Sequence, residues 1–336
     1  MSRSRCTRGL VEALEAHGLQ VKWLNRATLR RWLGGRGADS WIRRAMNRYR
    51  PDLVFVFWRD LPLDLLREFK EHALTVLWVE ESLATLGEAE VSYLRTPHLV
   101  GMSNLGHIEL LRERGVHNAV FLKAAFSPAV HYPVKPRGPR FDVAYIGGPG
   151  RRGQRADLMA QISRRFDSRV FGRGWHQHVP RLPELRVGGA VGPRKYRQVC
   201  ADARIVLGLN EVNRVPYYSS NRVFLTLGCG AFHLTHYVPG LEEVFEDGVH
   251  LAYFRSPEEC LDKLRFYLRN DQQRDEIAAR GNDLVRREHR YFDRIKSILT
   301  MLRGGLGADA LTETSLDRAR RLATDCRLSQ TPLLVE

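Results

Sequence analysis

The stretch SSNRVFLTLGCGAFHLTHYVPGLEEVFEDG, Ser219 to Gly248, joins a polar start, an apolar run, a glycine stop and a second apolar run. The first run, 223–227, has the spacing of a helix, and the glycines at 228 and 230 end it. The second run, AFHLTHY (231–237), is typical of a strand buried in a sheet. A short helix followed at once by a buried strand predicts an alternating α/β fold.

The same alternation continues on both sides of this stretch. Apolar strands are predicted at 20–24, 52–58, 73–79, 99–102, 120–123, 141–148, 168–175, 203–210 and 231–237. Helical patterns lie between them and continue at 257–270 and 272–289. Strands that are apolar throughout and separated by helices indicate parallel sheets covered on both faces.

The segment 127–140 (SPAVHYPVKPRGPR) interrupts this pattern with four prolines, and it predicts a linker. We therefore expect two Rossmann-like, doubly wound α/β domains that face a cleft. They comprise an N-terminal domain at 1–137 and a C-terminal domain at 138–303, whose last helix can pack back on the N-terminal domain. The weakly patterned residues 304–336 are expected to form a tail.

The composition is strongly basic, with 53 Arg and Lys, 38 Asp and Glu, and a formal net charge of +15. Twelve of the basic residues lie in the first 50, against three acidic residues. Such a field attracts polyanions, namely nucleic acid, anionic lipid or a phosphorylated substrate. Only seven of the 53 are Lys, and an Arg bias of this kind also arises from a GC-rich genome.

The sequence argues against a membrane span and against a disulfide framework. It has no run of 18 apolar residues, and its five cysteines are scattered without metal or redox spacing. We expect a reducing, cytoplasmic location.

A glycine-rich loop follows the strand at 141–146. It reads Gly147-Gly148-Pro149-Gly150-Arg151-Arg152, and Arg155 comes shortly after. Glycines let backbone N–H groups approach a phosphate, and arginines supply bidentate charge. A tight turn would explain the glycines alone, whereas the three arginines favour a phosphate site.

The polar start of the opening stretch also favours an anion site. Ser219 or Ser220 can cap the helix that follows, and Asn221 and Arg222 complete its start. Its free N–H groups and dipole would attract an anion. An Arg in the first turn opposes the dipole, so Arg222 is easier to understand if an anion lies beside it. A buried helix with a surface Arg is the alternative.

The region 140–295 resembles the C-terminal half of the spore-maturation (CgeB-type) glycosyltransferases, which are similar to glycosyltransferase family 4 with the GT-B fold. The shared features are Arg-x-Phe, Cys-Gly-Ala-Phe, Glu-Glu-x-Phe, a Ser-Pro-Glu-Glu helix start, a closing His-x-Tyr and the strand and loop FDVAYIGG. TVLWVEES and the run from VGMSN to HYP are similar to the N-terminal domain of that family more loosely.

The resemblance implies a nucleotide-diphosphate sugar as co-substrate, held by the C-terminal domain, and an acceptor held by the N-terminal domain. The diphosphate would meet Gly147–Arg155 and Ser220–Arg222. The base and ribose would lie near Gly172, Trp175 and Tyr196. Many relatives place a ribose-binding Glu after Arg-x-Phe, where this chain has Leu225. Ribose would then be held by another group, or donor recognition differs, or donor binding is lost.

Transfer of a sugar requires positive charge around the leaving diphosphate, a role that suits Arg151, Arg155 and Arg222. The acceptor hydroxyl also needs a base. Glu80 and Glu81 follow the strand at 73–79, and His107 begins a later helix, so all three are candidates. An acidic pair at a helix start and a structural His are the alternatives. No Asp-x-Asp motif lies beside the loop, and similar enzymes need no metal, so we expect neither metal nor cofactor.

Two further hypotheses use the basic N-terminal region. In the first, the chain is a non-catalytic protein that binds DNA or another polyanion. Leu225 in place of the usual ribose-binding Glu favours this hypothesis. In the second, it is a transferase whose acceptor is nucleic acid. Trp23, Trp32 and Trp41 lie nine residues apart among arginines, and they suit base stacking or the packing of basic helices.

Overall fold

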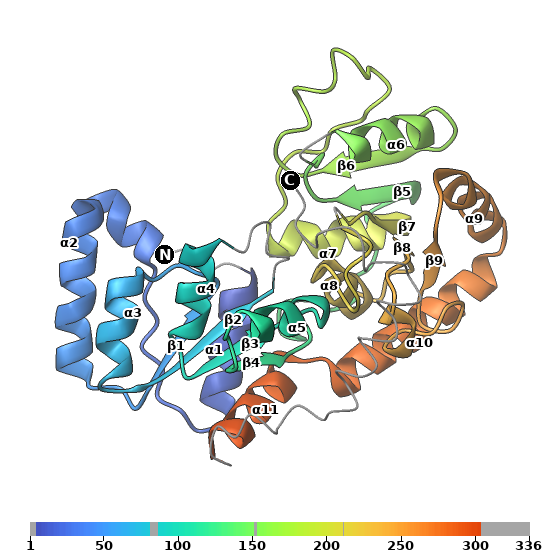
Figure 1. The fold of residues 1–336 in the computed structure, drawn as a ribbon. Coiled ribbons are helices and arrows are strands. Elements are labelled where there is room, and N and C mark those ends of the chain that lie inside the picture. The colour runs from blue at the N-terminus through green and yellow to red at the C-terminus, as the bar shows by residue number, and fades with distance from the viewer. Residues whose placement is uncertain (1–4, 81–86, 151–152, 211, 304–336) are drawn as a thin grey trace. The chain divides into compact units, whose positions relative to one another are not determined.

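The structure is a computed structural model, and it describes residues 5–80, 87–150, 153–210 and 212–303. The described chain forms two units (Figure 1). The N-terminal unit takes its described residues from Met1–Lys123, Arg214–Tyr218 and Phe292–Glu336. The C-terminal unit comprises those of Ala124–Asn213 and Ser219–Tyr291. Each unit has its own parallel sheet.

The N-terminal unit is built on four parallel strands in the order β1-β2-β3-β4. They are β1 (Leu53–Phe57), β2 (Leu74–Val79), β3 (Leu99–Met102) and β4 (Ala119–Phe121). Its helices are α1 (Arg5–Ala16), α2 (Arg26–Tyr49), α3 (Leu63–Lys70), α4 (Glu88–Arg95), α5 (Gly106–Glu113) and α11 (Tyr291–Arg303), which joins this unit from Phe292 on. β2 is buried over its last five residues, which explains its continuous apolar sequence.

The strand predicted at 20–24 is not formed, and the segment between α1 and α2 has no regular structure. The carbonyl of Gln20 instead accepts a hydrogen bond from the hydroxyl of Tyr49, at 2.8 Å. A strand needs a neighbour to pair with, and none of the described strands pairs with this segment. The helix α2 that follows has a break at Gly34, whose φ is 69°.

Two segments from later in the chain complete the N-terminal unit. The Tyr217 ring packs edge-on against Phe121 at 5.7 Å, within the segment that joins β7 to α8. At the start of α11, the ring of Phe292 stacks on His17 at 4.1 Å. Arg294 then donates a hydrogen bond to the carbonyl of Lys123 at 3.0 Å. Both segments are therefore fixed to this unit by specific contacts.

The C-terminal unit is built on five parallel strands in the order β6-β5-β7-β8-β9. They are β5 (Phe141–Ile146), β6 (Ser168–Phe171), β7 (Ala203–Gly208), β8 (His233–His236) and β9 (Ala252–Phe254). The helices are α6 (Gln154–Ser163), α7 (Pro193–Asp202), α8 (Arg222–Gly228), α9 (Pro257–Arg269) and α10 (Asp271–Glu288), with a 3₁₀ turn at Leu241–Glu243.

The strand order of this sheet reverses between β5 and β7. The chain runs from β5 to β6 on one side and then crosses to β7 on the other. Parallel sheets bind ligands in the crevice outside the carboxyl ends of the strands at such a switch point. The ends of β5 and β7 are therefore the first place to look for a site.

The helix α8 is held from its C-terminal end by α10. The amide nitrogen of Asn282 donates to the carbonyls of Leu227 at 2.6 Å and Gly228 at 3.1 Å, in the last turn of the helix. The carbonyl of Leu227 also accepts from the N–H of Gly230 at 2.9 Å. One residue earlier, Gly281 leaves no room for a side chain, since a Cβ there would overlap the carbonyl oxygen of His250 and lie 2.9 Å from Leu227. The two helices are in direct contact because position 281 is glycine.

None of the helices in the described part of the chain combines the length and the apolar character needed to cross a bilayer.

We predict that Gly281→Ala destabilises the C-terminal unit by about 1–3 kcal/mol, because the added methyl group must push α10 away from backbone that cannot yield. The measurement is the unfolding midpoint in urea. Gly35→Ala, in α2, is the matched control, since nothing lies within 4 Å of a Cβ there. Equal effects of the two substitutions would contradict the close packing of α8 and α10.

Candidate functional site

The guanidinium of Arg222 spans the switch point of the C-terminal sheet. Its Nη1 donates to the hydroxyl of Tyr145 at 3.0 Å and to the carbonyl of Ile146 at 3.3 Å, at the end of β5. Its Nη2 donates to the carbonyl of Leu209 at 2.8 Å, just beyond β7. These three acceptors are neutral oxygens, and together they fix the orientation of the guanidinium. A fixed cation therefore lies at the carboxyl ends of both strands.

Glycine is required beside this cation. A Cβ on Gly147 would overlap Nη1 of Arg222 and the ring of Tyr145. The backbone N–H of Gly147 donates to the carbonyl of Phe171 at 2.8 Å, which extends the pairing of β5 and β6 by one step. The absence of a side chain at 147 thus lets Arg222 lie against the start of the loop.

The loop after β5 is held in place by contacts with the loop after β6. The indole N–H of Trp175 donates to the carbonyl of Gly147 at 2.7 Å. Gly172 has a φ of 148°, and a Cβ there would overlap the same carbonyl. Gly147 is therefore held by one hydrogen bond and by the close approach of one glycine, both from the segment 171–175.

Arg155 also lies at this loop, at the first turn of α6. Its Nη1 is 3.5 Å from the carbonyl of Gly148, at the outer limit of a hydrogen bond, and its aliphatic part lies against Gly150. Gly148 is more open than Gly147, since the nearest atom to a Cβ there is the carbonyl of Arg173 at 3.8 Å. Arg151, the other predicted phosphate ligand, lies outside the described residues.

Two predicted ligand contacts lie behind the site and not on its surface. Trp175 and Tyr196 are both fully buried. Trp175 packs edge-on against Tyr145 at 5.7 Å, and the hydroxyl of Tyr196 is hydrogen-bonded to Thr226 of α8 at 2.9 Å. Neither ring can touch a base or ribose in this structure. Their role here is to position Gly147 and α8.

The start of α8 differs from the prediction. Its N-cap is Asn221 and not a serine, and the Asn221 side chain makes no capping hydrogen bond, whereas the Ser220 hydroxyl accepts a long one from the first helical N–H. Ser219 is buried, and the hydroxyl of Ser220 is 3.5 Å from the N–H of Arg222. The helix has only seven residues, so its dipole is small. Arg222 is tolerated in the first turn because its side chain reaches three oxygen acceptors on the sheet.

The position of the usual ribose-binding Glu is buried here. Leu225 is 3% exposed in the middle of α8. Its side chain packs in the core and offers no group that could accept a hydrogen bond from a ribose.

The positive charge of Arg222 affects the pKa of buried groups around it. Burial and then the Arg222 charge lower the pKa of His233, at the start of β8, to about 3. Neither of its ring nitrogens has a hydrogen-bond partner in the described chain. At neutral pH this histidine is therefore uncharged, and Arg222 stands as the cation of the switch point.

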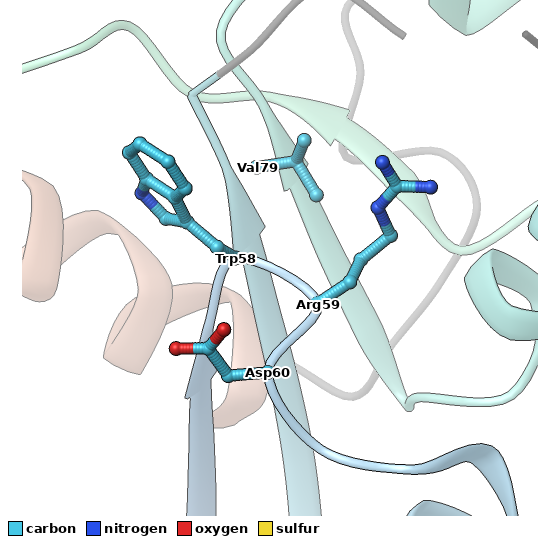
Figure 2. Close-up of a pocket in the computed structure, with 4 residues that line it drawn as sticks. All are labelled: Trp58, Arg59, Asp60 and Val79. Atoms are coloured by element: carbon cyan, nitrogen blue, oxygen red, sulfur yellow. The ribbon is translucent and has the colours of Figure 1, made fainter. Parts of the chain in front are cut away.

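The N-terminal unit has a hollow at the carboxyl ends of β1 and β2. It has a volume of about 210 Å³ and is lined by Trp58, Arg59, Asp60 and Val79. In Figure 2 the ring of Trp58 and the guanidinium of Arg59 lie on either side of Val79. This hollow was not expected from the sequence, because the apolar run 52–58 predicts that Trp58 is the last residue of a buried strand. β1 ends one residue earlier, and Trp58 is 41% exposed.

The backbone explains how Trp58 reaches the surface. Its φ is 61°, in the left-handed region that a bulky side chain rarely adopts. Strain of this kind persists where the surrounding structure holds it, and it clusters at functional sites. The N–H of Trp58 still pairs with the carbonyl of Trp78 at 2.9 Å, so the turn begins directly at the end of the sheet.

The predicted catalytic bases lie in the same unit but are not open to solvent. Glu80, after β2, is 6% exposed, and His107, in the first turn of α5, is 1% exposed. Burial lowers the pKa of His107 to about 4. His107 therefore cannot take a proton from a surface-bound acceptor in this structure. Glu81 lies outside the described residues.

Solved structures with the same arrangement of elements identify the fold. The chain is similar to HepE from Anabaena, solved in complex with UDP and glucose, with a TM-score of 0.63 and 14% identity over 88% of this chain and 89% of that chain. It is also similar to sucrose-phosphate synthase from Thermosynechococcus elongatus, with a TM-score of 0.64 and 11% identity over 88% and 92%. The fold is GT-B. The predicted α/β fold class is therefore confirmed.

A third GT-B structure, a glycosyltransferase from Rickettsia africae, is similar with a TM-score of 0.61 and 10% identity over 87% of this chain and 86% of that chain. The model of a glycosyl transferase-like family matches residues 151–300, less than half of the chain. No curated protein matches the sequence. The family match thus falls almost wholly on the C-terminal unit, which carries Arg222.

We predict that stability falls as the pH is lowered through the range set by His107. The folded protein keeps this histidine neutral down to about pH 4, whereas the unfolded chain protonates it below about pH 6.5. The unfolded state therefore binds more protons in between. His107 alone should cost about 2 kcal/mol between pH 7 and pH 5.

Urea unfolding at the two pH values measures this effect. His107→Asn should flatten the pH dependence of the N-terminal unit, while His72→Asn, at an exposed position after α3, should leave it unchanged. An unchanged slope in His107→Asn would contradict a buried neutral histidine.

Proposed function

We propose that this protein is a glycosyltransferase that moves a sugar from a nucleotide-diphosphate donor to an acceptor, and that it is of the CgeB type. The observation that carries the proposal is the cation of Arg222, fixed across the ends of β5 and β7 beside a glycine loop. The GT-B fold and the match to a glycosyl transferase-like family over 151–300 support it.

In this proposal the donor diphosphate lies against the loop at Gly147–Gly148 and against Arg222. Negative charge grows on the leaving diphosphate as the sugar bond breaks. A guanidinium already held in place stabilises that charge without having to reorganise. Arg155, at the first turn of α6, would add charge beside the same loop. Arg151, which lies outside the described residues, remains a candidate from the sequence alone. These cations supply the positive charge beside the leaving diphosphate that a metal ion supplies in other enzymes. We therefore propose transfer without metal or cofactor.

The base and ribose would contact backbone and not the buried rings of Trp175 and Tyr196. The loops after β6 and before α7 lie side by side, because the N–H of Gly172 donates to the carbonyl of Gly189 at 2.9 Å. Gly172 and Gly189 are both partly exposed. With Leu225 unable to accept a hydrogen bond, these backbone groups are our candidates for ribose recognition.

We place the acceptor at the hollow of the N-terminal unit beside Trp58. An exposed indole offers a flat apolar surface for the face of a sugar ring. Arg59 and Asp60, both exposed, supply a donor and an acceptor for hydroxyl groups at its edge. An apolar platform with a few polar groups is the usual composition of a ligand site.

We predict that Arg222→Lys weakens binding of the preferred nucleoside diphosphate, chosen from UDP, GDP, ADP and TDP, about tenfold or more. Lysine keeps the charge but cannot bridge β5 and β7 as a planar fork. Titration calorimetry measures the affinity. Arg204→Lys is the matched control, because Arg204 lies at the opposite end of β7, where it pairs with Asp271 at 2.6 Å.

A second variant moves the guanidinium of Arg222 without replacing the residue. Gly147→Ala should displace the guanidinium of Arg222 and weaken the nucleotide to a similar extent, while Gly138→Ala, with open space around its Cβ, should not. Wild-type affinity in both Arg222→Lys and Gly147→Ala would rule out this donor site.

We predict that Trp58→Ala raises the KM for a glycoside acceptor about tenfold and leaves the nucleotide affinity unchanged, since it removes only the stacking surface. The acceptor is first found by screening soluble glycosides with labelled donor. Trp41→Ala, at a partly exposed position on α2, serves as the control. If acceptor KM is the same in wild type and Trp58→Ala, the acceptor binds elsewhere.

A further inference from the structure

The bend of α2 presents an exposed surface that the proposed transfer reaction does not use. All seven residues from Arg30 to Arg36, Arg-Arg-Trp-Leu-Gly-Gly-Arg, are exposed. Trp32 is 79% exposed and its neighbour Leu33 is 47% exposed. Single apolar side chains at the surface are ordinary, but an adjacent pair that includes a tryptophan marks an interaction surface. We call this segment the α2 corner.

The α2 corner has a defined shape. The helix breaks at Gly34 and continues in a new direction, and Figure 1 shows the bend at one end of the long blue helix. Arg26, before the break, pairs with Asp39, after it, through two contacts of 2.8 and 3.2 Å. This hydrogen bond with Arg26 lowers the pKa of Asp39. The two halves are therefore held at a fixed angle.

The second half of α2 is fixed to the body of its unit. Ala38 and Ile42 are buried, and Ile42 packs with Leu65 and Phe69 of α3. On the same half, Arg43 pairs with Glu68 at 2.7 Å and with Asp64 at 3.3 Å. The corner is thus a rigid projection and not a loose end.

The α2 corner carries arginines that make no ion pair within the described part of the chain. Its three arginines, Arg30, Arg31 and Arg36, make no ion pair with a described residue, and the same holds for Arg44 and Arg48 further along α2. All five are exposed. A structural role would pair these side chains as it pairs Arg26 and Arg43. A cluster of exposed, unpaired cations instead suits a partner that is itself negatively charged.

We propose that the α2 corner docks this protein on the surface of an anionic lipid bilayer. Trp32 and Leu33 enter the boundary between head groups and acyl chains, the region that tryptophan prefers. The arginines on both sides stay at the level of the lipid phosphates and contact them. Each basic side chain near such a surface strengthens binding about fivefold. The proposal does not depend on the glycosyl transfer proposed above.

A bilayer accounts for more of the corner than nucleic acid does. A strand of nucleic acid would use the arginines and could stack a base on Trp32. It would gain nothing from Leu33, which offers neither a ring nor a polar group. A bilayer uses both apolar side chains together with the cations, and the glycines at 34 and 35 keep bulk away from the contact.

Sedimentation with vesicles tests the proposal on the full chain. The probes are vesicles of phosphatidylcholine alone and of a roughly 70:30 mixture of phosphatidylcholine and phosphatidylglycerol, at about 0.1 M salt. Wild type should sediment with the mixed vesicles and much less with the neutral ones. Trp32→Ser combined with Leu33→Ser should weaken the partition coefficient about tenfold or more. Arg30→Glu combined with Arg31→Glu should weaken it about a hundredfold.

Matched controls separate the corner from the overall charge. Phe266→Ser replaces an apolar side chain that is 47% exposed on α9. Arg137→Glu combined with Arg140→Glu makes the same change in net charge at exposed positions of a loop. Both controls should sediment nearly as wild type does. The circular dichroism spectrum of each variant checks that it is folded.

Three results would overturn the proposal. Wild type could remain in the supernatant with the mixed vesicles, or the corner variants could bind as well as wild type. A short DNA duplex could bind through Arg30 and Arg31 while the vesicles do not, which would assign the corner to nucleic acid. If instead Trp32→Ser with Leu33→Ser converts a dimer to a monomer in gel filtration without vesicle binding by wild type, the corner is a contact between two copies.

Discussion

A single guanidinium at the point where a sheet reverses its strand order determines the arrangement around the candidate donor site. Arg222 contacts oxygens at the ends of both β5 and β7, the two strands that part there. A partly buried cation must be surrounded by acceptors, because the loss of hydration is otherwise costly. The residues near it follow from that requirement. Position 147 has no room for a side chain. The hydroxyl of Tyr145 must lie near the carboxyl end of β5, where it accepts a hydrogen bond from Arg222.

The rest of the C-terminal unit keeps this arrangement fixed. Trp175 and Gly172 hold the loop after β5 from below, and Tyr196 bonds to Thr226 in the middle of α8. Asn282 satisfies the last carbonyls of α8. The position of Arg222 thus depends on contacts with three other parts of the chain. A site that must stabilise charge during a reaction benefits from such support, since a preorganised cation does not have to move.

Much of this fold could be predicted from the sequence, because apolar strands and amphipathic helices differ in period and the glycine loop has a clear composition. The errors arose where tertiary contacts decide the outcome. Trp58 continues an apolar run, yet a left-handed turn brings it to the surface. Trp175 and Tyr196 are aromatic residues of candidate loops, yet both are buried.

The polar residues at the start of α8 also differ from the expectation. Ser219 and Ser220 have the composition of a helix cap, but the cap is Asn221 and the serine hydroxyls do little for the helix. The reason to expect an anion beside Arg222 was that its charge opposes the helix dipole. The long side chain resolves that conflict by reaching the sheet. Only the three-dimensional position of Tyr145 and Leu209 could reveal this, since they lie 77 and 13 residues away.

Arginine has two separate uses in this chain. At the switch point one partly buried guanidinium is oriented by three oxygens at the ends of β5 and β7. At the α2 corner several are exposed and unpaired beside two apolar side chains. The first arrangement suits a small anion in a fixed position, and the second suits an extended negative surface. A net charge of +15 alone could not separate these two uses.

The central claim is that a nucleoside diphosphate binds at Arg222, and a thermal-shift panel tests it most directly. The panel contains UDP, GDP, ADP, TDP and CMP, the matching sugar nucleotides and a short DNA duplex. A ligand present at about 100 times its dissociation constant stabilises the folded state by about 2.7 kcal/mol. The account predicts that one nucleoside diphosphate and its sugar nucleotide raise the unfolding midpoint. If no nucleotide raises it and only DNA does, the donor site proposed here does not exist.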